Sequence, residues 1–467
     1  MNHTFSIRLP GGRLDLEVST LVRVGMILGV LLLSAFLAMR AQVNFLFLLI
    51  GIGGLLVLLQ APRLGLIILL VGSLVLPFSI GTGTQTPINI TVILIPVLLG
   101  VWVADMMRRR ELKLAYSRTM WPLFALAASA TVSLLAGSLP WNLFARTAPV
   151  NTQVAGWAIF IFSLGIFLLV GNLVDDVRWL KILVVLFLGI SGLYMASRIA
   201  ELPFSALMNY LHSDGSMFWV WTVAMAAGQL LFNRNLGRVG QLALAALILA
   251  TIGIGFFQAR DWASGWVPPM IALATILTLR SWRLGIVVII AGIAYVVLER
   301  PEMFALETGV ESYSILTRDV ARNILVQQVF PLSPIIGLGP ANYYWYTPLY
   351  PILGWYVNFN SHNNYVDILL QLGAVGMLCF IWLVTEIGLL GWRLRNRFKN
   401  NFAQGYVYGC IGGLVGSLAA AWLADWLFPF AYNIGLSGFR ASILAWLFMG
   451  GLVALEQIAR RSESKNS

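Results

Sequence analysis

The stretch that decides the fold class lies at residues 152–171 and reads TQVAGWAIFIFSLGIFLLVG. It runs for twenty residues without a charged side chain, which is the length that an α-helix needs to cross a bilayer. Comparable apolar runs recur along nearly the whole chain of 467 residues, of which 59% are hydrophobic and 10% are charged. Because a typical soluble protein is about one-quarter charged, this composition excludes a water-soluble enzyme as well as disordered, fibrous and disulfide-stapled proteins. The sequence therefore predicts an all-α polytopic membrane protein.

Apolar runs bounded by charged residues or by glycine and proline define the expected transmembrane helices. We expect about 14 of them, with 12 as the alternative, and one large outer loop between two late helices. Residues 1–299 would hold transmembrane helices 1–11, residues 300–361 an extracytoplasmic loop with short helices, residues 362–455 transmembrane helices 12–14, and residues 456–467 a cytoplasmic tail. The expected spans are 21–39, 45–61, 64–80, 89–106, 119–137, 152–171, 179–197, 214–232, 239–257, 262–279, 284–299, 363–390, 403–427 and 437–455.

The distribution of basic residues orients these helices. With the N-terminus in the cytoplasm, the inner segments carry 22 of the 30 basic residues, including every lysine, as the positive-inside rule requires. The net charge of +11 therefore reflects membrane topology rather than nucleic-acid binding. The polar stretch Met1–Thr20 lacks the apolar core of a cleavable signal, so we expect the first span to be an uncleaved anchor. The expected location is the bacterial cytoplasmic membrane, with both termini in the cytoplasm and the active face on the periplasmic or extracellular side.

Eight arginines fall on the outer side, where cations work against the insertion bias. Arginine can bind phosphate with two parallel hydrogen bonds, although it is also this chain's favoured cation and can snorkel to the interface. Arg318 and Arg322 lie four residues apart in Glu311–Val329, a segment of the outer loop that we expect to be helical, so both project from one face. The other six are Arg40, Arg146, Arg198, Arg260, Arg300 and Arg440.

The histidine that opens the span after the outer loop is the main candidate for chemistry. Of the other two histidines, His3 lies in the N-terminal tail and His212 at the outer start of a span, where an inert or structural role is expected. His362 is followed after eleven and fourteen residues by Gly373 and Gly376, which on a regular helix lie within about 20° and 40° of it. We expect one stripe in which the glycines admit a neighbouring helix and the imidazole lies at the outer end. The alternative is a capping or interfacial histidine on an ordinary packed helix.

This constellation resembles the O-antigen ligase family of membrane glycosyltransferases, which act on undecaprenyl-diphosphate-linked glycans. The family signature is a histidine, then Asn, Ser or Gln, and after nine residues Gly-x-x-Gly. His362, Asn363, Gly373 and Gly376 fit that spacing without a gap. The resemblance covers roughly residues 200–400 and is topological elsewhere.

The outer loop and its arginines extend the resemblance. A long outer loop directly precedes the histidine, and its residues Gly337 and Gly339 match a Pro-x-x-Gly-x-Gly turn of the family. Arg318 sits where the family places an arginine of this loop. Arg260 resembles the arginine of a Ser-Arg-Gly stretch, although this chain reads Ala-Arg-Asp there.

The resemblance implies an inverting, metal-independent glycosyltransferase with no cofactor. It would move a glycan from undecaprenyl diphosphate to a hydroxyl group of a lipid or glycan acceptor, as in lipopolysaccharide and other cell-envelope polysaccharide biosynthesis. Arg260, Arg318 and Arg322 would bind the diphosphate and stabilise the negative charge that develops as it leaves. His362 would be the general base that takes the proton of the acceptor hydroxyl.

Two alternatives stay open. An O-antigen or exopolysaccharide polymerase of the same superfamily would differ from a ligase only in its acceptor. A flippase or transporter for lipid-linked sugars belongs to a different class, and the absence of an evident internal repeat disfavours it. The sequence leaves the roles of Asp425, His212 and Arg440 open. Asp367 points about 140° from His362 on a regular helix, so we expect it to pair elsewhere.

Overall fold

The computed structural model describes residues 4–9, 12–17, 29, 43–76, 78–81, 87–111, 114–200, 215–259, 262–299 and 310–466. They fall into two compact units, Met1–Pro62 and Arg63–Ser467, and each is described by itself.

The described residues of the first unit include two strands and a helix. Strands β1 (Thr4–Leu9) and β2 (Gly12–Glu17) pair as an antiparallel hairpin, which corrects the expectation of a purely helical chain. Helix α2 (Val43–Gln60) coincides with the span expected at 45–61. The span expected at 21–39 lies outside the described residues apart from Gly29.

The second unit is built from helices, and each span expected between residues 64 and 455 coincides with one of them. A small hairpin, β3 (Ser79–Ile80) paired with β4 (Ile88–Asn89), precedes α4. The helices are α3 (Pro62–Val75), α4 (Ile90–Arg109), α5 (Met120–Ala136), α6 (Val150–Leu173), α7 (Val177–Ala200), α9 (Ser216–Phe232), α10 (Arg238–Phe257), α11 (Ala263–Arg280), α12 (Trp282–Glu299), α13 (Val310–Ile324), α14 (Asn364–Leu394), α15 (Phe402–Leu423) and α16 (Gly435–Asn466).

The helices have the length and composition of a multi-pass membrane protein. Within the described part of the chain, seven are long and apolar enough to cross a bilayer, namely α4, α6, α7, α10, α14, α15 and α16. Helices α3, α5 and α9 are apolar but shorter than eighteen residues. The helical membrane fold is therefore confirmed in its class, whereas the number of crossings stays a prediction. Helix α16 continues through residue 466, so the segment expected as a tail prolongs the last helix.

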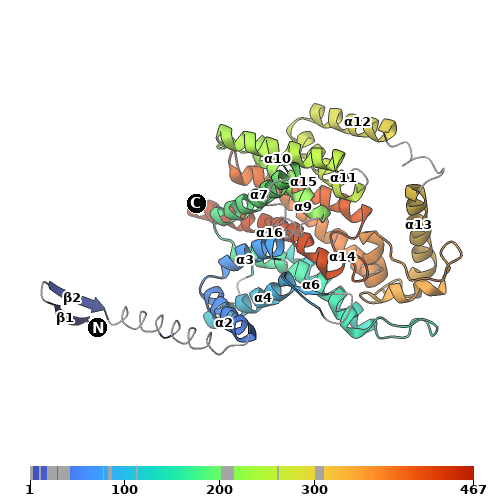
Figure 1. Ribbon diagram of the computed structural model, residues 1–467, viewed down its shortest axis with the longest axis horizontal. Helices are drawn as coiled ribbons and strands as arrows, with labels where there is room; N and C mark the ends of the chain where they lie inside the picture. The colour runs from blue at the N-terminus through green and yellow to red at the C-terminus, as the bar shows by residue number, and fades with distance from the viewer. Residues whose placement is uncertain are drawn as a thin grey trace. The chain divides into compact units, whose positions relative to one another are not determined.

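Close backbone contacts hold the centre of the second unit together (Figure 1). Helix α9 is buried along nearly its whole length and packs on α15 and α11, while α16 packs on α6. Gly228 of α9 faces Gly405 and Gly409 of α15, and a Cβ at 228 would lie 2.3 Å from the carbonyl oxygen of Gly405. A Cβ at Gly450 of α16 would lie 2.6 Å from the carbonyl oxygen of Phe167. Only glycine permits these approaches, which are a common way for membrane helices to associate.

The segment expected as an outer loop contains the short helices that the sequence predicts. Helix α13 continues as a π turn over Leu325–Val329, so the helix expected over Glu311–Val329 is confirmed from residue 310 onward. Single 3-10 turns follow at Phe330–Leu332, Asn342–Trp345 and Thr347–Leu349. Tyr343 and Tyr346 from these turns enter a small core with Leu325, Val329, Leu338, Leu370 and Phe430. The segment is therefore packed rather than structureless.

Helix α14 is interrupted at Gly373, whose backbone has a φ of 69° and a ψ of −171°. Residues 310–361, which are the described part of the predicted outer loop and are called the outer segment below, fill the break. The N–H groups of Ala374 and Val375 donate to the carbonyl oxygens of Pro334 (2.8 Å) and Ile335 (3.1 Å). These bonds satisfy backbone donors that the interrupted helix leaves without their usual acceptors. A Cβ at Gly373 would lie 2.2 Å from the carbonyl oxygen of Ile335, so this position requires glycine for its conformation and for its space.

The expected stripe of His362, Gly373 and Gly376 is therefore wrong. It assumed a constant step of 100° per residue, and the break at Gly373 ends that regularity. Gly376, beyond the break, does lie against a neighbouring helix, because its Cβ would come within 3.2 Å of the hydroxyl of Ser129 on α5.

Candidate functional site

The candidate site lies where the outer segment, the start of α14 and the loop between α15 and α16 meet. Asn363 is the N-cap of α14: its side chain accepts from the N–H groups of Tyr365 (2.9 Å) and Val366 (3.2 Å), and its amide donates to the carbonyl oxygen of Trp422 (2.9 Å). Asn364 donates to the carbonyl oxygen of Phe428 (2.7 Å). Residues 363 and 364 therefore bind the end of α15 and the loop at 424–434 to the start of α14.

Asn364 makes that attachment specific. Its side-chain oxygen accepts from the N–H groups of Leu427 (2.8 Å) and Phe428 (3.2 Å), in addition to the bond that its amide donates. Both polar ends of this buried amide are satisfied by one stretch of backbone, so the loop at 424–434 has a fixed position beside α14.

His362 directly precedes the N-cap of α14 and is half-buried, with a φ of 47° that is unusual for a residue with a side chain. Burial, together with the positive charges of Arg318 and Arg322, lowers the pKa of its imidazole to about 4. The imidazole is therefore neutral at pH 7. Arg318 and Arg322 therefore lie near enough to His362 for their charges to act on its imidazole.

The two arginines differ in their surroundings. Arg322 forms an ion pair with Asp319 (3.2 Å), and its Nε is buried without a hydrogen-bond partner. Burial is the main cause that lowers the pKa of Arg322, with the neighbouring charge of Arg318 adding to it. Arg318 has no ion-pair or hydrogen-bond partner among the residues that the structure describes. Both guanidinium groups thus keep donors for an anionic ligand.

Arg260 and His212 lie outside the described residues, so their expected positions are not tested. The two glycines of the predicted turn, Gly337 and Gly339, have φ values of 75° and 93°. A Cβ at Gly337 would lie 2.3 Å from the carbonyl oxygen of Gln371, which explains why this turn needs glycine against α14. The motif glycines therefore shape the backbone around the site and present no side chain to a ligand.

A buried carboxyl group organises the other side of the site. Asp367 is 1% exposed, and its Oδ1 accepts from the hydroxyls of Tyr343 (2.5 Å) and Ser361 (2.6 Å). Its Oδ2 is buried without a hydrogen-bond partner. Burial and the nearby Asp367 raise the pKa of Tyr343 well above its usual value, so Tyr343 remains a neutral donor. The expectation that Asp367 pairs away from the site is wrong, because it binds the residue next to His362.

A second buried acid reaches His362 through an amide. The side-chain nitrogen of Asn433 lies 3.3 Å from Nδ1 of His362 and donates to Oδ1 of Asp425 (2.5 Å). Oδ2 of Asp425 accepts from the N–H of Phe430 (2.7 Å). Burial raises the pKa of Asp425 to about 6, against the hydrogen bonds from Phe430 and Asn433, which lower it.

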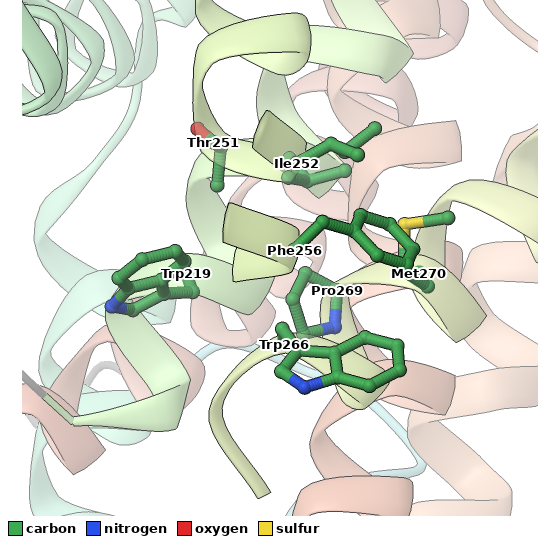
Figure 2. A pocket seen from close by; sticks show the side chains of 8 residues that line it. Trp219, Thr251, Ile252, Phe256, Trp266, Pro269 and Met270 are labelled. Atoms are coloured by element: carbon green, nitrogen blue, oxygen red, sulfur yellow. The ribbon is translucent and has the colours of Figure 1, made fainter. Parts of the chain in front are cut away.

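Two cavities lie elsewhere in the second unit. Figure 2 shows side chains of α9, α10 and α11 that line a gap, among them Trp219, Phe256 and Trp266. The gap has a volume of about 10 Å³ and an almost wholly apolar lining. Its volume suits side-chain packing and no substrate. A larger cavity of about 400 Å³ is lined in part by Trp426 from the loop at 424–434 and by Arg440 from α16. Arg440 donates to the carbonyl oxygens of Ser73 (2.9 Å) and Leu76, so it holds the end of α3.

Sequence reasoning missed three residues of this site, namely Tyr343, Asn364 and Asn433, and it left the role of Asp425 open. A signal existed for Asp425, since an acid between two apolar spans is costly unless it has partners. Nothing in the sequence identified its partners, because they come from turns whose geometry no periodicity describes. In comparisons with known proteins, this chain matches no family model and no curated protein.

Proposed function

We propose that this protein is a membrane glycosyltransferase that moves a glycan from undecaprenyl diphosphate to a hydroxyl group of an acceptor on the outer face of the cytoplasmic membrane. The observation that carries this proposal is that a neutral imidazole, His362, lies within the electrostatic reach of two guanidinium groups, Arg318 and Arg322. The residue pattern that resembles the O-antigen ligases surrounds His362.

The chemistry that such a group of residues can perform is displacement of a diphosphate. The acceptor oxygen forms a bond to the anomeric carbon, the bond from that carbon to the diphosphate oxygen breaks, and the electron pair leaves with the diphosphate. Arg318 and Arg322 would stabilise the charge on the leaving group, and attack from the opposite side would invert the anomeric centre. His362 would take the proton of the acceptor hydroxyl, for which it must be neutral beforehand.

The low pKa of His362 fits this order of events. An imidazole with a pKa near 4 is neutral at pH 7 but binds a proton weakly. A bound diphosphate would bring negative charge next to Arg318 and Arg322, which offsets their effect and raises the proton affinity of His362. The donor substrate would therefore prepare the base that the second substrate needs.

The proposal favours a ligase over a polymerase, because Asn363, Gly373 and Gly376 follow His362 at the spacing of the ligase family. Their structural roles give a reason for that spacing. Asn363 caps α14 and holds the end of α15, whereas Gly373 receives the backbone of the outer segment at Ile335. Both contacts position the backbone that carries His362.

Reconstitution of the purified protein with labelled undecaprenyl-diphosphate glycan and candidate acceptors tests the proposal. We expect transfer in the presence of a chelator, and we expect His362→Ala to lower its rate by about 10²–10⁴-fold while donor binding persists. Arg318→Lys and Arg322→Lys should weaken donor binding, because a point charge lacks the planar two-pronged contact. Arg146→Lys is the matched control, since Arg146 is exposed on the loop between α5 and α6.

Four outcomes would contradict the proposal. Transfer at the normal rate by His362→Ala would show that His362 is not the general base. Unchanged donor affinity in both lysine variants would show that Arg318 and Arg322 do not bind the diphosphate. Movement of lipid-linked glycan across the bilayer without transfer to any acceptor would favour a flippase. A product whose length grows by repeat units would place the protein among the polymerases.

A further inference from the structure

The amide of Asn433 lies between a buried acid and the imidazole, and one nitrogen contacts both. Its Nδ2 donates to Oδ1 of Asp425 and lies 3.3 Å from Nδ1 of His362. An amide nitrogen only donates hydrogen bonds, so Nδ1 of His362 accepts in this arrangement. A neutral imidazole with an accepting Nδ1 carries its proton on Nε2.

This arrangement leaves His362 unable to act as a base. Nε2 already holds a proton, and the lone pair of Nδ1 is engaged by Asn433. Rotation of the Asn433 amide by 180° would present its Oδ1 to His362 instead, where it could accept an Nδ1–H and free the lone pair of Nε2. The same rotation turns Oδ1 toward Asp425, which is tolerable only when the Asp425 carboxyl carries a proton and donates it to the amide oxygen.

We propose that Asp425 and Asn433 are positioning residues that select which nitrogen of His362 carries the proton, so that His362 becomes a base when Asp425 is protonated. This inference rests on the proposed function for its consequence in catalysis, but the selection itself is a property of the three side chains. With Asp425 ionised, the proton of His362 is on Nε2. With Asp425 protonated, the amide turns, the proton is on Nδ1, and Nε2 is free.

The transfer step then balances in protons and electron pairs. The acceptor O–H bond breaks and its proton moves to Nε2 of His362, while the acceptor oxygen bonds to the anomeric carbon and the diphosphate leaves with the electron pair of the broken bond. The imidazolium that results donates through Nδ1 to the amide oxygen of Asn433. It returns to the neutral form by releasing the Nε2 proton to water.

The charges around His362, Asp425 and Asn433 decide the pH range in which both tautomers of His362 occur. Asp425 is 1% exposed and lies near the buried Asp367, and burial places its pKa at about 6. Arg318 and Arg322 act on His362 and oppose a positive charge there, which keeps the imidazole neutral above pH 4. The hydroxyl of Tyr343 stays neutral over this range. Between about pH 4 and pH 8, therefore, the change of tautomer follows the protonation of the Asp425 carboxyl, beside which Asp367 is the other buried acid.

A purely structural role for Asp425 is the competing explanation, because its Oδ2 also accepts from the N–H of Phe430. Asp425→Asn separates the two. An asparagine at 425 can keep the bond from Phe430 with its oxygen and can donate its amide to Oδ1 of Asn433, as a protonated Asp425 would. Asp425→Asn is thus a permanent substitute for the protonated form of Asp425, whereas Asn433→Ala removes the amide that contacts both Asp425 and His362.

Nitrogen NMR of the histidine rings in the full-length protein, with ¹⁵N-labelled histidine, reports the tautomer without any substrate. His362→Gln identifies the signal by its loss. In the unaltered protein we expect the Nδ1–H form at pH 5 and the Nε2–H form at pH 8, with a midpoint near pH 6. In Asp425→Asn we expect the Nδ1–H form throughout. One tautomer at both pH values in the unaltered protein would overturn the proposal.

Transfer kinetics provide the second measurement. For the unaltered protein, kcat/KM should fall about tenfold per pH unit above pH 6, as the protonated fraction of Asp425 falls. Asp425→Asn should remove this alkaline fall and retain activity at pH 8, whereas Asn433→Ala should lower activity at every pH. An unchanged alkaline fall in Asp425→Asn would overturn the inference. A tautomer change without glycan transfer under any condition would instead overturn the proposed function and leave the selection intact.

Discussion

The glycine-lined contacts at the centre of the second unit and the polar assembly at the start of α14, which is the candidate site, both bring two stretches of backbone close together. They do so in different ways. In the centre, Gly228 and Gly409 sit in regular helices and bring two backbones together. In the assembly, Gly373 interrupts a helix and lets a loop backbone complete it. The first arrangement follows from small residues in apolar runs, whereas the second depends on individual hydrogen bonds. The centre is thus specified by composition, and the assembly by particular residues.

Gly228→Leu should give the largest effect, and it tests whether the centre of the second unit depends on the close contact between α9 and α15. The new side chain has no space, because its Cβ alone would lie 2.3 Å from the carbonyl oxygen of Gly405. We expect a loss of more than about 3 kcal/mol, seen as failure to fold or as a collapsed thermal transition in detergent. Gly253→Leu on α10 is the control, since nothing lies within 4 Å of a Cβ there. Equal stability of the two variants would show that the close approach is unnecessary.

Gly373→Ala should cost about 2 kcal/mol from the backbone conformation, with the contact to Ile335 adding to it. We expect the outer segment to detach from α14, so that protease cleavage within residues 330–345 rises while the thermal transition of the bundle shifts less than in Gly228→Leu. Gly354→Ala has the same positive φ but open space around its Cβ, and it should cost only about 1 kcal/mol. Unchanged protease resistance in Gly373→Ala would mean that the break does not hold the segment.

Two tyrosines, one in the polar assembly and one in the helix bundle, allow the two regions to be compared through the loss of a single hydrogen bond. Tyr343 donates to the buried Asp367, whose other oxygen has no partner, whereas Tyr406 in the bundle donates to the carbonyl oxygen of Phe448 (2.7 Å). We expect Tyr343→Phe to cost about 2 kcal/mol and Tyr406→Phe about 1 kcal/mol, measured by thermal or denaturant unfolding. The reverse order would show that the acid at 367 tolerates the loss of a donor.

The smallest expected effect is a pH dependence confined to the assembly. The folded pKa of Asp425, about 6, lies above its ordinary 3.8, so its favourable contribution is present at low pH and is lost as the pH rises through 6. The folded pKa of His362, about 4, lies below its ordinary 6.5, so stability rises as the pH increases from 4 to 6.5. Because the two slopes oppose each other over the same pH range, we expect the net change in the free energy of unfolding between pH 4 and pH 6.5 to be about 1 kcal/mol or less.

Single variants should separate these slopes. Between pH 4 and pH 6.5, Asp425→Asn should make the melting temperature rise more steeply with pH than in the unaltered protein. His362→Gln should make it fall. Identical profiles for all three proteins would mean that neither group changes its protonation on folding.

The sequence predicted the helices well because each depends only on a long apolar run. The hairpin at Thr4–Glu17 was missed, although Phe5, Ile7 and Leu9 alternate with polar residues, a period of two that the emphasis on apolar runs passed over. The stripe through Gly373 failed because a periodicity argument assumes an unbroken helix. Asp367 was placed away from the site for the same reason, since its partners Tyr343 and Ser361 come from outside its helix.

The site residues were predictable only in part. His362, Arg318 and Arg322 could be proposed because each residue type brings its own chemistry and its position follows from topology. Asn433 could not, because an amide near the end of an apolar stretch carries no signal until the neighbours of its two polar ends are known.

The attachment of residues 424–434 to Asn364 bears on how the protein is made. Ribosomes deliver a chain from its N-terminus, so His362 enters the membrane before the segment that surrounds it has been synthesised. Asp425 and Asn433 arrive about sixty to seventy residues later, just ahead of α16. A nascent chain that stalls before that point would carry the imidazole and both outer-segment arginines without the loop that completes the site, and would therefore be inert until synthesis is nearly finished.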